Sequence, residues 1–273
     1  LLSRELGTKL TGRHLTYELF PFSYAEFLVY QKASPGIDSF RDYFIAGGFP
    51  EYIKQSNPEI LQQLLRDILY RDIIVRHGLK NSTLVGKLAT FLMTNAGKKF
   101  SYNSLMKTFE TGSANTIIDY VSYFEDSYLL LTIPSFSYSI KDQIRNPKKI
   151  YSIDHGMARV NSLSFSKDEG RILENMVFLH LRRKWKKIFY YSVKSECDFV
   201  VFDRDKVEMV VQVCYELSDD NMAREISGLK EAMDFFQLKT GFLISYNQED
   251  VIEDGERKII VMPAWKWMME GKL

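Results

Sequence analysis

The polar residues with the clearest chemical potential lie in a stretch that has the pattern of a β-hairpin. Residues 197, 199 and 201 alternate with residues 198, 200 and 202, and residues 207–214 divide between two faces in the same way; this period of two is typical of strands. Residues 203–206, Asp-Arg-Asp-Lys, are expected to form the turn between them. The sequence therefore predicts two paired antiparallel strands.

The pairing register decides which side chains share a face of this hairpin. When Asp198 is opposite Gln212, one face becomes wholly apolar. That face holds Cys197, Phe199, Val201, Met209, Val211 and Val213. The other face collects four polar side chains, Glu196, Asp198, Gln212 and Cys214. Because a carboxylate on a central strand costs free energy unless it binds something, we interpret this face as a catalytic or metal site, or as the remains of one.

The elements around the hairpin predict an α/β sandwich for residues 163–273. A helix over residues 170–184 carries Glu174 among its apolar positions. Three strands, a second helix and two further strands follow, at residues 188–193, 197–203, 207–215, 219–236, 241–245 and 258–262. The order α-β-β-β-α-β-β predicts a mixed sheet with flanking helices.

Residues 57–162 have the pattern of a second unit that is rich in α-helix. Helices are predicted to begin at Pro58, Ser82, Tyr102 and Ser113. Two strands follow, at residues 128–133 and 149–153. Three helices, a Gly-containing turn and a β-hairpin are typical of a winged helix-turn-helix.

A winged helix-turn-helix places the start of its second motif helix in the major groove of DNA. The polar candidates there are Asn115 and Thr116. The loop between the two strands adds four basic candidates, Lys141, Arg145, Lys148 and Lys149. The helix itself carries acidic residues and neither Lys nor Arg, which weakens phosphate binding. DNA is therefore one predicted partner, and a protein-docking role for this unit is the alternative.

Residues 1–56 contain an ordered set of short segments. These are Gly12-Arg13, Tyr17-Glu18-Leu19-Phe20-Pro21-Phe22-Ser23, Glu26-Phe27 and Gly47-Gly48-Phe49-Pro50-Glu51-Tyr52. The set resembles a family of prokaryotic AAA-type ATPases, in which a P-loop ATPase domain precedes a winged-helix region and a C-terminal domain of unknown function. The resemblance implies that residues 1–56 are the remnant or lid of an ATPase domain and a connector. It also implies that Arg13 senses nucleotide; the alternative is a surface arginine beside a turn glycine.

The phosphate-binding loop of such an ATPase, G-x-x-x-x-G-K-[ST], does not occur in this sequence. Because the chain begins at Leu1 without Met, we expect it to be part of a longer protein. ATP and its Mg²⁺ are therefore assigned to that parent protein. The cofactor considered for this chain itself is a Mg²⁺ ion at the hairpin.

The order of elements in residues 163–273 resembles the PD-(D/E)XK nuclease fold. Position by position, the resemblance assigns the helix glutamate to Glu174 and the strand aspartate to Asp198. It implies a Mg²⁺ ion held by Glu174, Glu196 and Asp198, which would activate water for phosphodiester cleavage. The E-x-K position falls on Gln212-Val213-Cys214. Gln212 is thus the third candidate catalytic position, in degenerate form, and no lysine is present in that strand.

Composition sets wide limits on function. The 273 residues have a net charge of +1 and 45% hydrophobic residues, so no overall charge favours nucleic acid or a membrane surface. No apolar run is long enough to span a bilayer, and no membrane partner is expected. The two cysteines are interpreted as buried thiols of a cytoplasmic protein.

Three functions from different classes stay open at this point. The first is a binding and regulatory portion of an AAA-type ATPase, which carries a degenerate nuclease-like domain and couples a separate ATPase domain to DNA or to a protein partner. The second is an Mg²⁺-dependent DNA endonuclease of the PD-(D/E)XK type. The third is a protein-docking module without a role in nucleic-acid binding.

Overall fold

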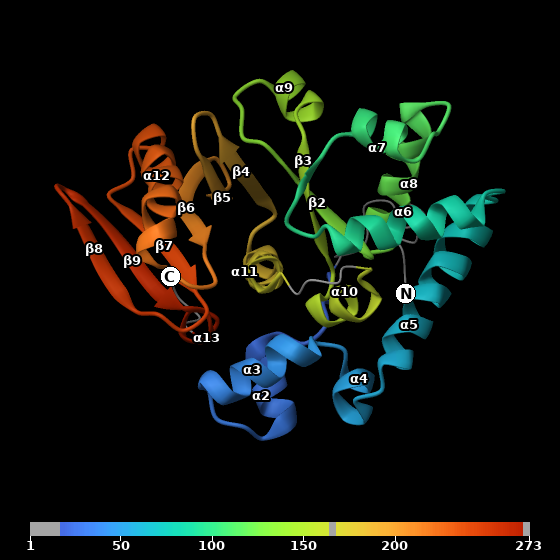
Figure 1. Cartoon of the computed structure of the whole chain (residues 1–273), viewed down its shortest axis with the longest axis horizontal. Helices are drawn as coiled ribbons and strands as arrows, with labels where there is room; N and C mark the ends of the chain where they lie inside the picture. Colours follow the sequence, from blue (N-terminus) through green and yellow to red (C-terminus); the bar gives the residue numbers. More distant parts are fainter. Residues whose placement is uncertain (1–16, 164–167, 270–273) are drawn as a thin grey trace.

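The computed structural model describes residues 17–163 and 168–269. Arg13, the candidate nucleotide-sensing residue, lies outside the described residues. The chain is a mixed α/β protein with a helical first half and a mixed β-sheet in its second half (Figure 1). Helix α11 (Glu169–Lys184) lies between these two parts.

Consecutive helical segments make up the first part. They are α2 (Tyr24–Gln31), α3 (Ile37–Ala46), α4 (Pro50–Gln55), α5 (Pro58–Asp67) and η1 (Ile68–Val75). The Ser23 hydroxyl accepts from the backbone N–H of Glu26, and the Glu26 carboxylate accepts from the backbone N–H of Ser23, so α2 begins with a capping box. The helix predicted from Pro58 is present, but it continues as the wider π-helix η1.

Residues 82–161 combine helices with a small antiparallel sheet. The helices are α6 (Ser82–Thr94), α7 (Tyr102–Thr108), α8 (Ala114–Asp126), α9 (Ile140–Arg145) and α10 (His155–Asn161). The strands are β1 (Lys99–Phe100), β2 (Leu130–Pro134) and β3 (Lys148–Ser152), and β3 is central in the order β1-β3-β2. The predicted helices and the β2–β3 pair are confirmed. The segment between β2 and β3, expected to be a loop, contains α9.

The second half of the chain forms a six-stranded mixed sheet. Its strands are β4 (Lys187–Ser192), β5 (Glu196–Asp203), β6 (Lys206–Val213), β7 (Thr240–Ser245), β8 (Asp250–Asp254) and β9 (Arg257–Pro263). The spatial order is β4-β5-β6-β7-β9-β8, in which β6, β7 and β9 run parallel and the other neighbours pair antiparallel. The mixed sheet is as predicted, with the exposed strand β8 added at its edge.

Two long helices cover the opposite faces of this sheet. Helix α11 packs on the face that carries Phe199 and Val211. Helix α12 (Asp219–Phe235) packs on the face that carries Val200 and Val210. The short helix α13 (Ala264–Trp267) follows β9. The sheet therefore has a helix on each face, as the order of elements predicts.

The predicted register of the hairpin is confirmed, with Phe199 paired with Val211 and Val201 paired with Met209. The predicted side for Cys197 is wrong. Cys197 packs with Val200 on the α12 side of the sheet rather than with Phe199. The alternation breaks at Asp198, because this side chain turns toward β3 and α11 and leaves the α12 side to Cys197. Both cysteines, Cys197 and Cys214, are free and buried.

Residues 17–22 are bound to the end of α11 by hydrogen bonds from two arginine side chains. Arg182 donates from Nη1 and Nη2 to the Glu18 carboxylate at 2.8 and 2.9 Å. Arg183 Nη2 donates to the Pro21 carbonyl oxygen at 2.5 Å. These basic side chains therefore hold residues 17–22 against the helix that carries Glu174. Among the described residues, no helix has the length and apolar character needed to cross a membrane.

Candidate functional site: a lysine among three carboxylates

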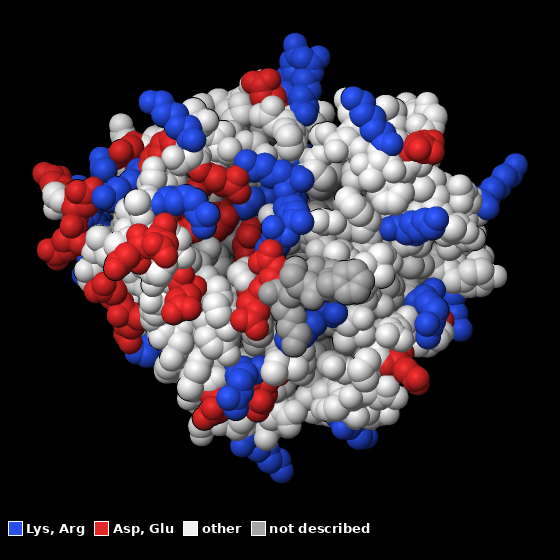
Figure 2. Space-filling view, viewed as in Figure 1, with Lys and Arg blue, Asp and Glu red and all other residues white. Residues whose placement is uncertain are grey.

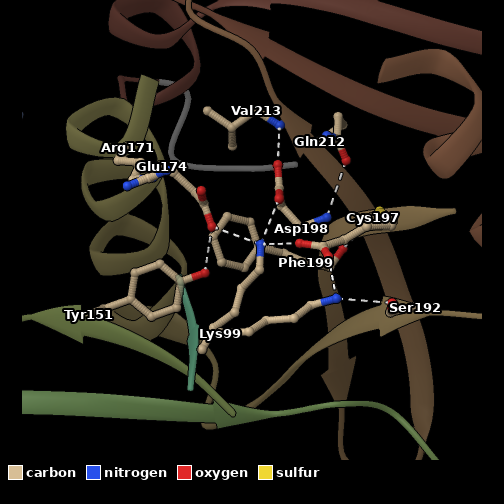
Figure 3. Close-up of polar contacts among 12 residues, drawn as sticks. Lys99, Tyr151, Arg171, Glu174, Ser192, Cys197, Asp198, Phe199, Gln212 and Val213 are labelled. Atoms are coloured by element: carbon tan, nitrogen blue, oxygen red, sulfur yellow. Dashed lines mark hydrogen bonds and ion pairs between the residues drawn. The ribbon is translucent and has the colours of Figure 1, made fainter. Parts of the chain in front are cut away.

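The most concentrated set of charges surrounds the side-chain nitrogen of Lys149. Its Nζ lies 3.0 Å from Glu174 Oε1, 2.8 Å from Glu196 Oε1 and 2.8 Å from Asp198 Oδ1 (Figure 3). Lys149 comes from β3, Glu174 from α11, and the other two carboxylates from β5. The three candidate metal ligands are thus brought together, around an ammonium group.

Strand β3 delivers two side chains to this cluster. Lys149 and Tyr151 are two residues apart, so they project from the same side of the strand. The Tyr151 hydroxyl donates to Glu174 Oε1 at 2.7 Å, and its ring stacks on Phe178 of α11 with centroids 4.1 Å apart. This stacking fixes the separation of β3 and α11 at the point where Glu174 meets Lys149.

A second ammonium group lies at the rim of the cluster. Lys99 of β1 is the strand partner of Lys149 and forms an ion pair with Glu196. Lys99 Nζ also contacts the Ser192 hydroxyl at 3.0 Å (Figure 3). Burial raises the pKa of Glu196, but the attraction of Lys149 and Lys99 outweighs it, so the net shift is downward. Glu196 is therefore the carboxylate that stays ionised most readily.

Burial and charge act in opposite directions on the other pKa values of the cluster. Burial raises the pKa of Glu174 to about 7, which Lys149 opposes and the charge of Asp198 reinforces. Burial also raises the pKa of Asp198 against the attraction of Lys149. Burial alone would lower the pKa of Lys149, but Asp198 and Glu174 raise it well above its ordinary value. The ammonium is therefore charged at physiological pH, while Glu174 titrates near neutrality.

The Asp198 carboxylate is held from a second direction. The backbone N–H of Val213 donates to Asp198 Oδ2 at 2.9 Å, so one oxygen faces β6 and the other faces Lys149. The carboxylate accepts two hydrogen bonds and is fixed in orientation. Its position on the α11 side departs from the strict alternation that the sequence predicts.

Gln212, the third candidate catalytic residue, occupies a neighbouring position. Its Oε1 accepts from the backbone N–H of Asp198 at 3.2 Å, and its Nε2 donates to Glu225 Oε2 at 2.7 Å. Its side chain is therefore committed to α12, and its hydrogen bonds do not go to Lys149. The expectation that Gln212 joins the Glu174 cluster directly is corrected, because the amide reaches the buried Glu225 instead.

The predicted DNA-contacting residues are dispersed. Lys149 is 2% exposed and lies inside the carboxylate cluster, so its assignment to a DNA-contacting loop is wrong. Lys148 is half-buried and its Nζ donates to the Tyr102 hydroxyl at 3.2 Å. Lys141 and Arg145 are exposed on α9, and the exposed Asn115 and half-buried Thr116 lie in the first turn of α8.

The role of Lys149 in this cluster was absent from the sequence expectations. The nuclease pattern predicts its lysine on the strand that holds Gln212. The lysine of this cluster instead comes from another sheet, 49 residues before Asp198. The available signal is a lysine two residues before Tyr151 in a mostly apolar strand, in the run Lys149-Ile150-Tyr151-Ser152. Such a lysine must be paired when it is buried.

The cluster opens onto a cleft of about 790 Å³ between α11, the β5–β6 hairpin and α12. Its polar lining includes Arg171, Glu174, Glu196, Asp198, Gln212, Arg224 and Glu225. Figure 2 shows lysine and arginine side chains beside acidic ones near the centre of the face of the molecule that is in view. Over the described ranges, no group of three or more His, Cys, Asp or Glu side chains has an arrangement suited to a metal ion. The Lys149 ammonium stands between the three carboxylates of the cluster.

Two curated proteins are similar to most of the chain. An uncharacterised protein of Methanocaldococcus jannaschii is 36% identical over 299 residues, which cover 98% of this chain and 66% of that protein. An uncharacterised protein of Haemophilus influenzae is 27% identical over 271 residues, which cover 93% of this chain and 66% of that protein. The chain therefore spans just under two thirds of the length of these relatives.

A family described as a domain of unknown function (DUF8612) matches residues 37–168. The matched region contains Lys149 and ends before Glu174 and Asp198. The ion pairs of the candidate site therefore join a residue inside this matched region to residues beyond it.

Proposed function

We propose that this chain is the C-terminal binding and regulatory portion of an AAA-type ATPase, and that residues 163–273 are a degenerate PD-(D/E)XK nuclease-like domain. The observation that carries the proposal is the Lys149 ammonium, within 3.0 Å of Glu174, Glu196 and Asp198. A helix glutamate and a strand aspartate converge as such a site requires. The position for a cation, however, is taken by a side chain of the protein.

The electrostatic argument concerns the space between the carboxylates. A Mg²⁺ ion binds oxygen ligands at about 2.0–2.1 Å, so on these same oxygens it would lie within a few ångströms of Lys149 Nζ. Two cations at that distance repel each other strongly in a buried site. The surrounding carboxylates raise the pKa of Lys149, which favours the charged ammonium in the cluster as it stands and disfavours its use as a base toward water.

The second candidate function is an Mg²⁺-dependent endonuclease, and one specific observation favours it. Lys149 supplies from β3 the lysine that the strand of Gln212 lacks, and the cluster opens onto a cleft of about 790 Å³. When bound, Mg²⁺ would activate water and stabilise phosphate charge. Glu174, Glu196 and Asp198 would hold the ion, and Lys149 would orient the phosphate beside it.

Substitution of Lys149 separates these two functions because they predict opposite outcomes. A plasmid-cutting assay with Mg²⁺ and with Mn²⁺ is run on the unmodified chain, Asp198→Ala and Lys149→Met, with the exposed Lys239→Met as control. The binding proposal expects no cutting by the unmodified chain and tighter Mn²⁺ binding by Lys149→Met, measured by calorimetry. Metal-dependent cutting that is lost in both Asp198→Ala and Lys149→Met would establish the endonuclease instead.

We further propose that residues 57–162 include a winged helix, with α6, α7 and α8 as its helices and β2–β3 as its hairpin. The support is the order of these elements and the antiparallel pairing of β2 with β3. Of the six predicted DNA-contacting residues, the exposed basic ones are Lys141 and Arg145. Their position on one short helix is consistent with weak phosphate binding rather than sequence readout.

A salt series on duplex DNA decides between DNA and a protein as the partner. Binding that weakens with salt and falls in a Lys141→Gln, Arg145→Gln double variant supports DNA contact through α9. No binding at low salt leaves protein docking, with a separate ATPase domain as the first partner to test. A cytoplasmic location is part of the same proposal, since two free buried thiols fit a reducing compartment.

A further inference from the structure

An exposed aromatic surface lies where the segment between β2 and β3 meets helix α12. Tyr138 is 83% exposed and Phe235 is 44% exposed, and their ring centroids lie 6.0 Å apart. Ile140 and Ile144 of α9, which follow Tyr138 in the chain, are exposed as well. These four side chains form the Tyr138 surface. Exposed apolar side chains that gather in this way mark an interaction site.

A cluster of more buried rings supports the Tyr138 surface. Phe136 contacts Tyr138 edge-to-face with centroids 5.2 Å apart, and it stacks on Phe202 at 5.5 Å. Phe235 in turn contacts the buried Tyr191 at 5.3 Å. The two exposed rings are therefore held in place from one side, while ring area remains open to solvent. Such preorganisation lowers the entropy cost of binding a partner.

Basic side chains lie on both sides of the Tyr138 surface. Lys141 and Arg145 are exposed one turn apart on α9, with the exposed Asp142 between them in sequence. On the other side, the exposed Lys194 lines the cleft of the carboxylate cluster. Within the part of the chain that the structure describes, none of these three basic side chains forms an ion pair. Their charges therefore face solvent.

Helix α12 connects the Tyr138 surface to the cleft of the carboxylate cluster. Ser227 lines that cleft, and Glu231 and Phe235 follow at intervals of four residues on the same side of the helix. A rise of about 1.5 Å per residue places Phe235 about 12 Å along the helix from Ser227. The Glu231 carboxylate accepts the backbone N–H groups of Lys194 and Ser195, which holds the β4–β5 loop against this side of α12. A continuous surface thus leads from α9 to the cleft.

We propose that this surface binds single-stranded nucleic acid, whose bases stack on Tyr138 and Phe235. Its phosphates contact Lys141 and Arg145 on one side of the rings and Lys194 on the other. Aromatic side chains between basic ones suit a single strand, because its unpaired bases have open ring faces that a duplex keeps inside its own stack. The inference rests on the proposed contact of α9 with DNA, and it assigns the strandedness of the partner.

The first turn of α8 gives a separate reason to expect a single strand rather than a duplex. In the proposed winged helix, this turn would enter the major groove of a duplex. It offers Asn115 and Thr116, and α8 contains neither lysine nor arginine. Contacts with phosphate dominate the affinity for a duplex, so docking through α8 would be weak.

Fluorescence anisotropy of the whole chain with three labelled probes tests the preference. The probes are oligothymidine, oligouridine and a DNA duplex of the same length, and the first two distinguish DNA from RNA. We expect the better single strand to bind about tenfold more tightly than the duplex at low salt. Equal or tighter binding of the duplex would overturn the inference and leave the contact of α9 with DNA standing. Absence of binding by all three would overturn both, and would leave protein docking as the role of this surface.

Replacement of Tyr138 tests the stacking contact. Tyr138→Leu keeps an apolar side chain and is expected to weaken binding of the single strand about tenfold, as for the loss of one stacked base. Tyr138→Phe keeps the ring and should bind as the unmodified chain does. Tyr70→Leu is the matched control, because Tyr70 on η1 is 62% exposed. Equal affinity of Tyr138→Leu and the unmodified chain, at equal thermal midpoints of unfolding, would show that the ring does not bind a base.

Substitution of Lys194 tests whether the bound strand extends to the cleft. Loss of one phosphate contact should reduce the slope of log affinity against log salt by about 0.7 for a single strand, which we expect for Lys194→Gln. Lys54→Gln is the control, since this exposed lysine lies on α4, at the end of the molecule opposite α9 (Figure 1). An unchanged slope for Lys194→Gln would contradict the proposed path from α9 to the cleft.

Discussion

Lys149 Nζ and Asp198 Oδ1 lie 2.8 Å apart, although the two residues are 49 positions apart and belong to different sheets. Lys149 lies on the central strand of the three-stranded sheet, and Asp198 lies on β5 of the six-stranded sheet. The candidate site is therefore located at the joint between two units of the chain. A change in how these units pack would change the charge of the site.

Removal of the Lys149 ammonium is expected to lower the free energy of unfolding. Lys149→Met leaves Glu174, Glu196 and Asp198 without their shared cation, and breaking a buried ion pair costs about 3–5 kcal/mol. Urea unfolding of the variant and of the unmodified chain measures this loss. Lys141→Met, on the exposed α9, is expected to change stability by less than about 0.5 kcal/mol.

A divalent cation is expected to restore part of the stability lost in Lys149→Met. Mn²⁺ would bind the three freed carboxylates in the folded state and raise the thermal midpoint of unfolding. The unmodified chain is expected to gain less, because Lys149 Nζ occupies the space between them. Equal Mn²⁺ stabilisation of both proteins would contradict the view that the lysine takes the place of a metal.

Glu174 is expected to reduce stability as pH rises toward neutrality. Its folded pKa of about 7 is above its ordinary value of 4.5, so the folded state holds the proton more tightly. The stability gained from this raised pKa is fully present below about pH 4.5 and is lost as pH rises through about 7. It amounts to at most about 3 kcal/mol. His155 and His180 have lowered pKa values and act in the opposite direction at acidic pH.

The comparison that isolates this effect is Glu174→Gln, which keeps a neutral side chain at every pH. Urea unfolding at about pH 5 and about pH 8 should show a smaller loss of stability with rising pH in the variant than in the unmodified chain. The histidine contributions are common to both proteins and cancel. Parallel pH profiles would mean that Glu174 is not the group that titrates near neutrality.

The ion pair between Arg182 and Glu18 is expected to hold residues 17–22 against α11. The pair is bidentate and only 14% and 15% exposed, so Arg182→Met should cost about 1–3 kcal/mol. Hydrogen exchange of the peptide that contains residues 17–22 should accelerate, while exchange of the β5–β6 hairpin should not. An unchanged rate of hydrogen exchange in residues 17–22 would show that the Arg182–Glu18 ion pair does not hold these residues in place.

Gly228 is expected to tolerate no side chain. It lies on α12, where an added Cβ would collide with the backbone carbonyl of Glu196. Gly228→Ala should therefore move α12 away from β5 and cost about 1–3 kcal/mol. Gly86→Ala is the matched control, since it lies within helix α6 with open space around it and should gain about 0.5–1 kcal/mol. Thermal unfolding of both variants measures the contrast.

The sequence by itself determined the local structure of the site. Alternation in β5 and β6 predicted the register that pairs Phe199 with Val211, because a shift of one residue would move Met209 and Val211 to the opposite face of the sheet. Apolar spacing likewise identified the helix that carries Glu174. The strand period placed Glu196 and Asp198 on one face, whereas Glu174 was joined to them by the resemblance to the nuclease fold.

Only the tertiary structure decided what these carboxylates contact. The partner of Asp198 is Lys149, whose place depends on how β3 packs against α11, and no period within one strand specifies a contact between two sheets. The same holds for Gln212, whose amide binds Glu225 on α12, and for Arg182, whose partner Glu18 lies 164 residues away. Periodicity reports which face of an element is buried, whereas the pairing of buried charges is fixed by the packing of whole elements.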